Sequence, residues 1–188
     1  MKELSDVIGR DPKDSAAYFH RGNNWANQGW NDKAIADYSE AIRLVPNFAA
    51  AHNHRGSMWA EQGDYEKALA DYSEAIRIDP KQPDPHNGQA WLWATCPDAR
   101  FRDGKKAVES ATRACELDEW IDPANLDTLA AAYAEAGEFA SAVKWQTKAK
   151  ESVRNNADKA AYEKRLEQYR SGQPYRQPPR PGTQSVRH

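Results

Sequence analysis

The feature that most constrains the fold is a segment that occurs twice along the chain. Residues 20–29 read HRGNNWANQG, and residues 54–63, which lie 34 positions later, read HRGSMWAEQG. Residues 15–48 and 49–82 align without a gap and are identical at 20 of 34 positions. Self-similarity at a fixed period of this length is typical of solenoids, in which similar supersecondary units stack on one another.

Apolar and small residues recur at helical spacing within each repeat. In the first repeat they form two stripes, one made of Tyr18, Gly22 and Trp25 and the other of Ala34, Tyr38, Ala41 and Ile42. Between the stripes, the sequence NQGWND supplies a glycine-centred break and an Asp near the next helix start. Each repeat is therefore predicted to be a helix, a tight turn and an antiparallel helix. Neither hairpin can bury its stripe alone, so we expect the hairpins to stack.

These residues resemble the tetratricopeptide repeat family. The matching residues of the first unit are Tyr18, Gly22, Trp25, Gly29, Ala34, Tyr38, Ala41 and Pro46. Those of the second are His52, Gly56, Trp59, Gly63, Tyr65, Ala68, Tyr72, Ala75 and Pro80. A later unit carries Leu126, Leu129, Ala130, Tyr133, Gly137, Phe139, Ala142 and Ala149. The resemblance implies an all-α fold, a right-handed α-α superhelix of antiparallel helix pairs with a C-terminal capping helix.

The repeats divide the chain into seven segments. We expect a half-repeat with only a second helix at residues 1–14, repeats at 15–48 and 49–82, a variant repeat with a longer interhelix loop at 83–122, a fourth repeat at 123–154, a capping helix at 155–171 and a Pro/Arg-rich flexible tail at 172–188. The variant repeat resembles units of bacterial multi-repeat proteins, so a bacterial source is expected. The half-repeat carries Leu4, Val7 and Ile8, which predict an apolar patch that favours self-association or contact with a preceding repeat.

The C-terminal residues change character after the predicted capping helix. That helix places Tyr162, Leu166 and Tyr169 along one side. The sequence SGQPYRQPPRPGTQSVRH that follows has four Pro, three Arg and no acidic residue, a composition typical of an extended, flexible tail. Because the tail is basic, a second interpretation stays open, in which it occupies the binding groove of its own or a neighbouring molecule.

The sequence contains no motif that indicates an enzyme, a metal or a cofactor. It has no Gly-rich phosphate loop, no HExxH, no Cys-x-x-Cys and no nucleophile elbow. Cys96 and Cys115 are expected to be free thiols, and packing is favoured over a reactive role for Cys96. His20 and His54 occupy equivalent places and could face one another, although a polar packing role is favoured over a metal site.

The net charge of -2 provides no bias toward nucleic acid, and no apolar run approaches the length of a membrane span. The first residues lack the apolar stretch of a signal peptide, so a cytoplasmic location is expected.

Opposite charges also recur in register. Arg21 and Asp37 are sixteen residues apart, and so are Arg55 and Asp71. We expect these pairs to join the two helices of each hairpin, an interpretation favoured over ligand binding by the arginines.

The resemblance implies that the first helices line a concave groove that binds peptides. The residues at the groove-facing places are Phe19, Asn23, Asn27, Asn53, Ser57, Glu61, Asn87, Trp91, Asp127 and Glu135. Asn53 and Asn87 are one repeat apart and could bind a ligand backbone, because an amide side chain both donates and accepts. The acidic members favour a neutral or basic ligand. The alternative is that these residues are only solvated helix positions.

The sequence therefore predicts a protein–protein interaction scaffold that binds an extended segment of a partner protein and has no catalysis of its own. The alternative is a regulatory or substrate-docking segment of a larger multidomain enzyme.

Overall fold

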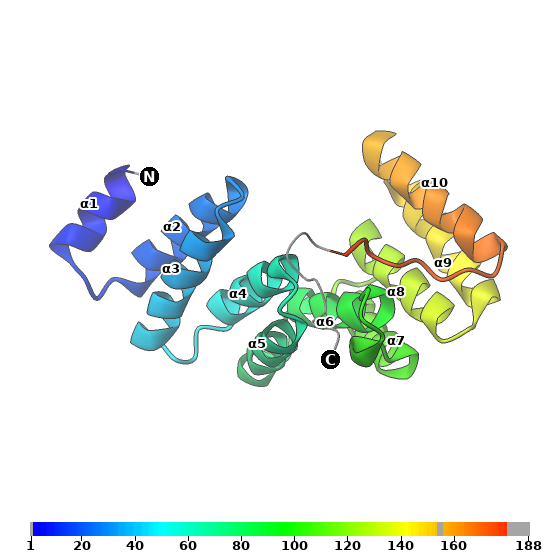
Figure 1. The fold of residues 1–188 in the computed structure, drawn as a ribbon, viewed down its shortest axis with the longest axis horizontal. Coiled ribbons are helices and arrows are strands. Elements are labelled where there is room, and N and C mark those ends of the chain that lie inside the picture. The colour runs from blue at the N-terminus through cyan, green and yellow to red at the C-terminus, as the bar shows by residue number, and fades with distance from the viewer. Residues whose placement is uncertain (1, 154–155, 180–188) are drawn as a thin grey trace, which may run out of the picture. The chain divides into compact units, whose positions relative to one another are not determined.

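The computed structural model describes residues 2–153 and 156–179, and within these ranges the chain is all-helical without a strand. The elements are α1 (Lys2–Arg10), α2 (Ser15–Asn27), α3 (Asn31–Leu44), α4 (Ala49–Gln62), α5 (Tyr65–Ile78), α6 (Pro83–Thr95), the 3-10 turn η1 (Ala99–Phe101), α7 (Gly104–Leu117), α8 (Pro123–Glu135), α9 (Phe139–Ser152) and α10 (Asn156–Arg170) (Figure 1). The prediction of an all-α fold is confirmed.

Consecutive helices pack in pairs, α2 with α3, α4 with α5, α6 with α7, and α8 with α9, and α10 packs on α9. The first helices of these pairs begin at Ser15, Ala49, Pro83 and Pro123, the residues where the repeats were expected to begin. The expected boundary between the fourth repeat and the capping helix, at residues 154 and 155, lies outside the described residues. The chain divides into two compact units, residues 2–80 with α1 to α5 and residues 81–179 with α6 to α10.

In the first unit, the core forms where a glycine of one helix meets an aromatic ring of the next. Tyr38 is fully buried, and a Cβ atom built on Gly22 would lie 2.7 Å from its ring. Tyr72 takes the same place against Gly56, where the shortest such distance is 3.1 Å. The absence of a side chain therefore lets the ring of the second helix lie against the backbone of the first.

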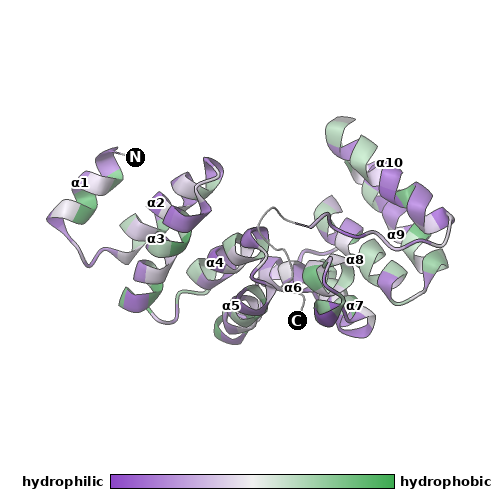
Figure 2. Cartoon of the chain, in the orientation of Figure 1, coloured by the Kyte–Doolittle hydropathy of each residue, from purple (hydrophilic) through white to green (hydrophobic). Residues whose placement is uncertain are grey.

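The core of the second unit is built largely from alanine, with Leu126 and Leu129 among its largest buried side chains. Small side chains allow close approach between the helices. The helix α10 adds Tyr162, Leu166 and Tyr169, which are all buried, as their spacing along one side predicts. Figure 2 shows hydrophobic and hydrophilic residues alternating around the individual helices, as expected for helices with one buried side.

The hairpin of α6 and α7 has the longest connection between paired helices in the part of the chain that the structure describes. It occupies residues 96–103, whereas residues 28–30 and 63–64 join the first two pairs. Cys96 at its start and Cys115 in α7 are both free and buried. Burial raises the pKa of both thiols, that of Cys115 to about 12, which argues against a reactive role.

Candidate interaction site

Two of the predicted groove residues on α2 take part in packing. The ring of Phe19 lies 4.9 Å from that of Phe48 and 5.1 Å from that of His54, between centroids. The side-chain oxygen of Asn23 accepts a hydrogen bond of 2.8 Å from the hydroxyl of Tyr38. Both side chains therefore have partners within the first unit.

The predicted residues on α4 are also engaged. Asn53 is only 8% exposed, so the structure places it in the interior and not on an open face. The hydroxyl of Ser57 donates to the carbonyl of Asn53 and accepts from the hydroxyl of Tyr72, both at 3.2 Å. The bond from Tyr72 joins α5 to α4.

Asn27 and Glu61 are the two exposed members of the predicted set in the first unit. The carboxylate of Glu61 accepts a 2.9 Å hydrogen bond from Asn31, which links the second repeat to the first. The first unit thus offers few of the predicted side chains to a ligand.

The recurring charges form the predicted ion pairs. Arg21 donates two hydrogen bonds to Asp37, of 2.7 and 2.8 Å, and Arg55 donates two to Asp71, of 2.8 and 2.7 Å. His52 lies 3.1 Å from the same Asp71 carboxylate. Burial acts to raise the pKa of Asp71, but the hydrogen bonds from Arg55 and His52 outweigh it and hold that pKa below its ordinary value. The arginines are therefore bound within their hairpins, as expected.

In the second unit, two of the predicted residues lie largely inside the fold. Asp127 is 5% exposed and accepts hydrogen bonds from Gln146, at 2.7 Å, and from Arg165, at 2.8 Å. Burial raises the pKa of Asp127, and the charge of Arg165 and the two hydrogen bonds offset this only in part. Asn87 is half-buried, and its side-chain oxygen is enclosed without a donor. The Asp127 side chain is therefore closed to a ligand, and so is the side-chain oxygen of Asn87.

Trp91 and Glu135 are brought together with the C-terminal residues of the chain. The ring of Tyr175 lies 5.8 Å from that of Trp91 at an angle of 35°. The guanidinium of Arg165 lies 5.4 Å from the Tyr175 centroid and 5.8 Å from the Trp91 centroid. Tyr175 is therefore in contact with an aromatic face and a cation at the same time.

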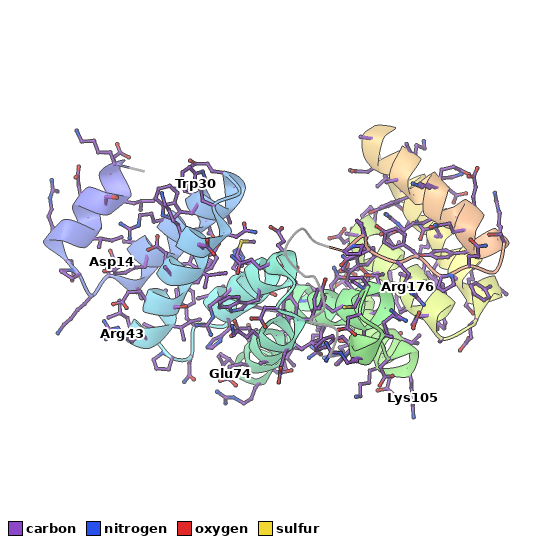
Figure 3. The ribbon with its side chains drawn as sticks, in the orientation of Figure 1. Asp14, Trp30, Arg43, Glu74, Lys105 and Arg176 are labelled. Carbon is purple, nitrogen blue, oxygen red and sulfur yellow. The ribbon has the colours of Figure 1, made fainter. Side chains whose placement is uncertain are left out.

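The next two residues of the chain bind polar groups of α6 and α8. Arg176, which is labelled in Figure 3, forms an ion pair with Glu135 and donates a 3.3 Å hydrogen bond to the carbonyl of Ala94. The backbone N–H of Gln177 donates to the carbonyl of Thr95 at 2.9 Å. We call Trp91, Ala94, Thr95, Glu135 and Arg165 the α6–α8 surface, with Arg165 supplied by α10.

This contact differs from the flexible tail expected for residues 172–188. Residues 175–177 lie against the α6–α8 surface, because ring, charge and backbone partners are all available there. Figure 1 shows the segment turning back from the end of α10 and running along the helices of its own unit. Residues 180–188 lie outside the described residues.

A model of the tetratricopeptide repeat family matches residues 26–83, and solved tetratricopeptide structures match most of the chain. The chain has the fold of tetratricopeptide repeat proteins. The similar structures include YrrB, described as a TPR protein with an unusual peptide-binding site, with 19% identity, a TM-score of 0.67, and coverage of 90% of this chain and 88% of that chain.

Two other similar structures support the same repeat fold. TTC0263, a thermophilic TPR protein of Thermus thermophilus, has 18% identity and a TM-score of 0.67 over 90% of this chain and 86% of that chain. MamA has 20% identity and a TM-score of 0.66 over 85% and 88% of the respective chains. At these identities the likeness extends to the fold. A search of curated proteins found no match.

Three features at the α6–α8 surface were not predicted from the sequence. They are Arg165, the carbonyl groups at the end of α6, and Arg102, which lies 3.2 Å from Glu135. Arg102 belongs to the long connection of the third repeat and also donates to the carbonyl of Cys96 at 2.9 Å. The longer connection of the third repeat, which contains Arg102, is the sequence feature that could have indicated this site.

Other kinds of site find no support in the described ranges. Among these residues, no three His, Cys, Asp or Glu side chains gather in a way that could hold a metal ion. None of the described helices is both long and apolar enough to cross a membrane.

Proposed function

We propose that this chain binds an extended segment of a partner protein, and that the α6–α8 surface receives it. The repeat fold suggests an interaction scaffold. The assignment to the α6–α8 surface is supported by its binding of residues 175–177, because an extended segment of the chain already fits there.

The residues proposed to contact the ligand differ from those that the sequence predicted. Asn53 and Asp127 are enclosed, so we assign the contacts to Trp91 and Glu135, which already bind the tail. A carboxylate at the centre of the surface favours a basic segment, and binding is expected to weaken as salt increases. The alternative, a docking segment of a larger multidomain enzyme, would use the same surface, and we propose no catalytic role for these residues.

A second interaction is favoured by α1. None of its residues is buried, and Val7 remains 37% exposed. We propose that this apolar side contacts a second copy of the chain.

The peptide proposal can be tested by selecting binders from a random peptide library on the full chain. The chain should carry Tyr175→Ala and Arg176→Ala, which we call the open-surface variant, so that its own tail does not fill the site. The selected peptides should bind at least about tenfold more weakly when Trp91→Ala or Glu135→Gln is added, because each removes one principal contact. Glu109→Gln, on the exposed side of α7, is the matched control and should leave the affinity of the selected peptides unchanged.

Two results would overturn the proposal. Selected peptides that bind the Trp91→Ala and Glu135→Gln proteins with unchanged affinity would place the site elsewhere. A library that provides no binder would show that the open-surface chain does not bind extended peptides.

A further inference from the structure

The bound tail also indicates which partner segment the surface selects. Resting on the proposed function above, we propose that the α6–α8 surface recognises an extended segment in which an aromatic residue is followed directly by arginine and then by a residue other than proline. Residues 175–177 are the copy of this pattern within the chain, and they compete with the partner for the surface.

The aromatic position is defined by Trp91 and by Arg165, and Asp127 fixes the second of these side chains. Trp91 provides a ring face, and Arg165 provides a cation that lies within 6 Å of both Trp91 and Tyr175. The buried carboxylate of Asp127 binds Arg165 at 2.8 Å, which fixes the guanidinium. A ring placed here gains both stacking and cation–π attraction, whereas an aliphatic side chain gains neither.

The arginine position is defined by an acid and a helix end. Glu135 is largely enclosed, with 13% of its side chain exposed, and it already binds Arg102 on one side. Arg176 adds a second cation, which also donates to the carbonyl of Ala94 in the last turn of α6. The partial negative charge at the carboxyl end of α6 favours this cation. The planar guanidinium can reach both acceptors at once, which a lysine ammonium does less well.

The third position is defined by backbone groups alone. The last carbonyl groups of any helix have no partner within it. In α6, the carbonyl of Leu92 accepts from Cys96 and that of Trp93 accepts from Asp103. The carbonyl groups of the following two residues, Ala94 and Thr95, accept from residues 176 and 177. Because the N–H of residue 177 is required, proline cannot take its place.

The long connection of the third repeat explains why this site lies here. Arg102 in that connection donates to the carbonyl of Cys96 and approaches Glu135 at 3.2 Å. It therefore holds the Glu135 carboxylate close to the end of α6. In the first two hairpins, whose helices are joined by residues 28–30 and 63–64, no equivalent residues are present.

The contacts of the tail are few enough to be exchanged. Arg176 keeps 34% of its side chain exposed, so solvent reaches its ion pair with Glu135. Gly172, with φ of 72°, ends α10 and returns the chain toward the surface, so the tail is a tethered ligand with a high effective concentration. A partner that carries the same pattern must therefore compete with it.

The test uses a fluorescent peptide with the sequence of residues 172–179, GQPYRQPP, and measures anisotropy on the full chain. The peptide should bind the open-surface variant at least about tenfold more tightly than the wild-type chain, because the variant's own tail no longer competes. Lys159→Glu, an exposed change on α10, is the control and should bind as wild type does. Peptides with Tyr175→Ala, Arg176→Lys or Gln177→Pro should each bind at least about tenfold more weakly to the open-surface variant.

The outcomes separate this inference from the proposed function. Equal affinity for the wild-type and open-surface chains would overturn the competition, and equal affinity of the altered peptides would overturn the recognition pattern. The single change Arg176→Ala in the chain repeats the comparison with the Tyr175 ring retained, if the double variant is poorly folded. Library peptides that depend on Trp91 but lack an aromatic–arginine pair would refute this inference and leave the proposed function standing. If the affinity of the library peptides does not depend on Trp91 at all, both this inference and the proposed function are refuted.

Discussion

Gly22 marks the closest approach between two helices of the first repeat. A Cβ atom at this position would lie 2.7 Å from the ring of Tyr38, which is fully buried and cannot move aside. Gly22→Ala should therefore lower the free energy of unfolding by about 1–3 kcal/mol, although alanine is the better helix former. Gly9→Ala in α1 is the matched control, since nothing lies within 4 Å of its Cβ position, and it should stabilise by up to about 1 kcal/mol. Urea unfolding measures the free energy of unfolding of both variants, and changes of the same sign would contradict this account.

Individual side chains also show how far the sequence could predict the site. The sixteen-residue spacing predicted both Arg–Asp pairs, because repeated charges in register leave few other partners. The sequence predicted that Asn53 and Asp127 face an open groove, whereas both side chains are buried. Successive residues of a helix point about 100° apart, so a small rotation of the helix moves a side chain from the surface to the interior. A repeat period does not determine that rotation.

At the scale of helices, the ion pair between Arg55 and Asp71 joins α4 to α5. The pKa of Asp71 in the folded protein lies below its ordinary value, which is about 3.9 in an unfolded chain. The stability that this carboxylate contributes is therefore complete above about pH 4 and is lost as the pH falls through the folded pKa. Acid should weaken this connection between the two helices.

Asp71→Asn tests this connection. At neutral pH it should lower the free energy of unfolding by about 1–3 kcal/mol, because Arg55 and His52 lose a charged acceptor. The difference from wild type should narrow below about pH 4, where the wild-type carboxylate also loses its charge. Glu74→Gln is the control and should change nothing measurable, since its pair with Arg77 lies on the surface. Thermal unfolding followed over a range of pH measures the difference in stability between wild type and Asp71→Asn. A difference that stays constant with pH would contradict this account.

At the scale of the whole molecule, the sequence predicted the helix pairs well and left open whether the tail is flexible or bound. Glycine and proline positions, small-residue stripes and the 34-residue period all indicate the same hairpins, and such agreement between levels specifies a fold. The contact of Arg176 with Ala94 joins residues 82 positions apart and follows no period. Tail composition alone favours disorder, and the partners that order residues 175–177 become visible only when α6, α8 and α10 are assembled.

The last prediction concerns assembly through α1. Val7 is 37% exposed, and none of the residues of α1 is buried, so its apolar side is available to a second copy of the chain. Sedimentation velocity should show a mass that rises with concentration for the wild-type chain. Val7→Asp should reduce that rise, because a carboxylate in an apolar contact loses its hydration without a partner. Gly9→Asp adds the same charge to the same helix, about 200° around its axis, and should leave the rise unchanged. A wild-type chain that stays monomeric at the highest concentrations would show that α1 forms no such contact.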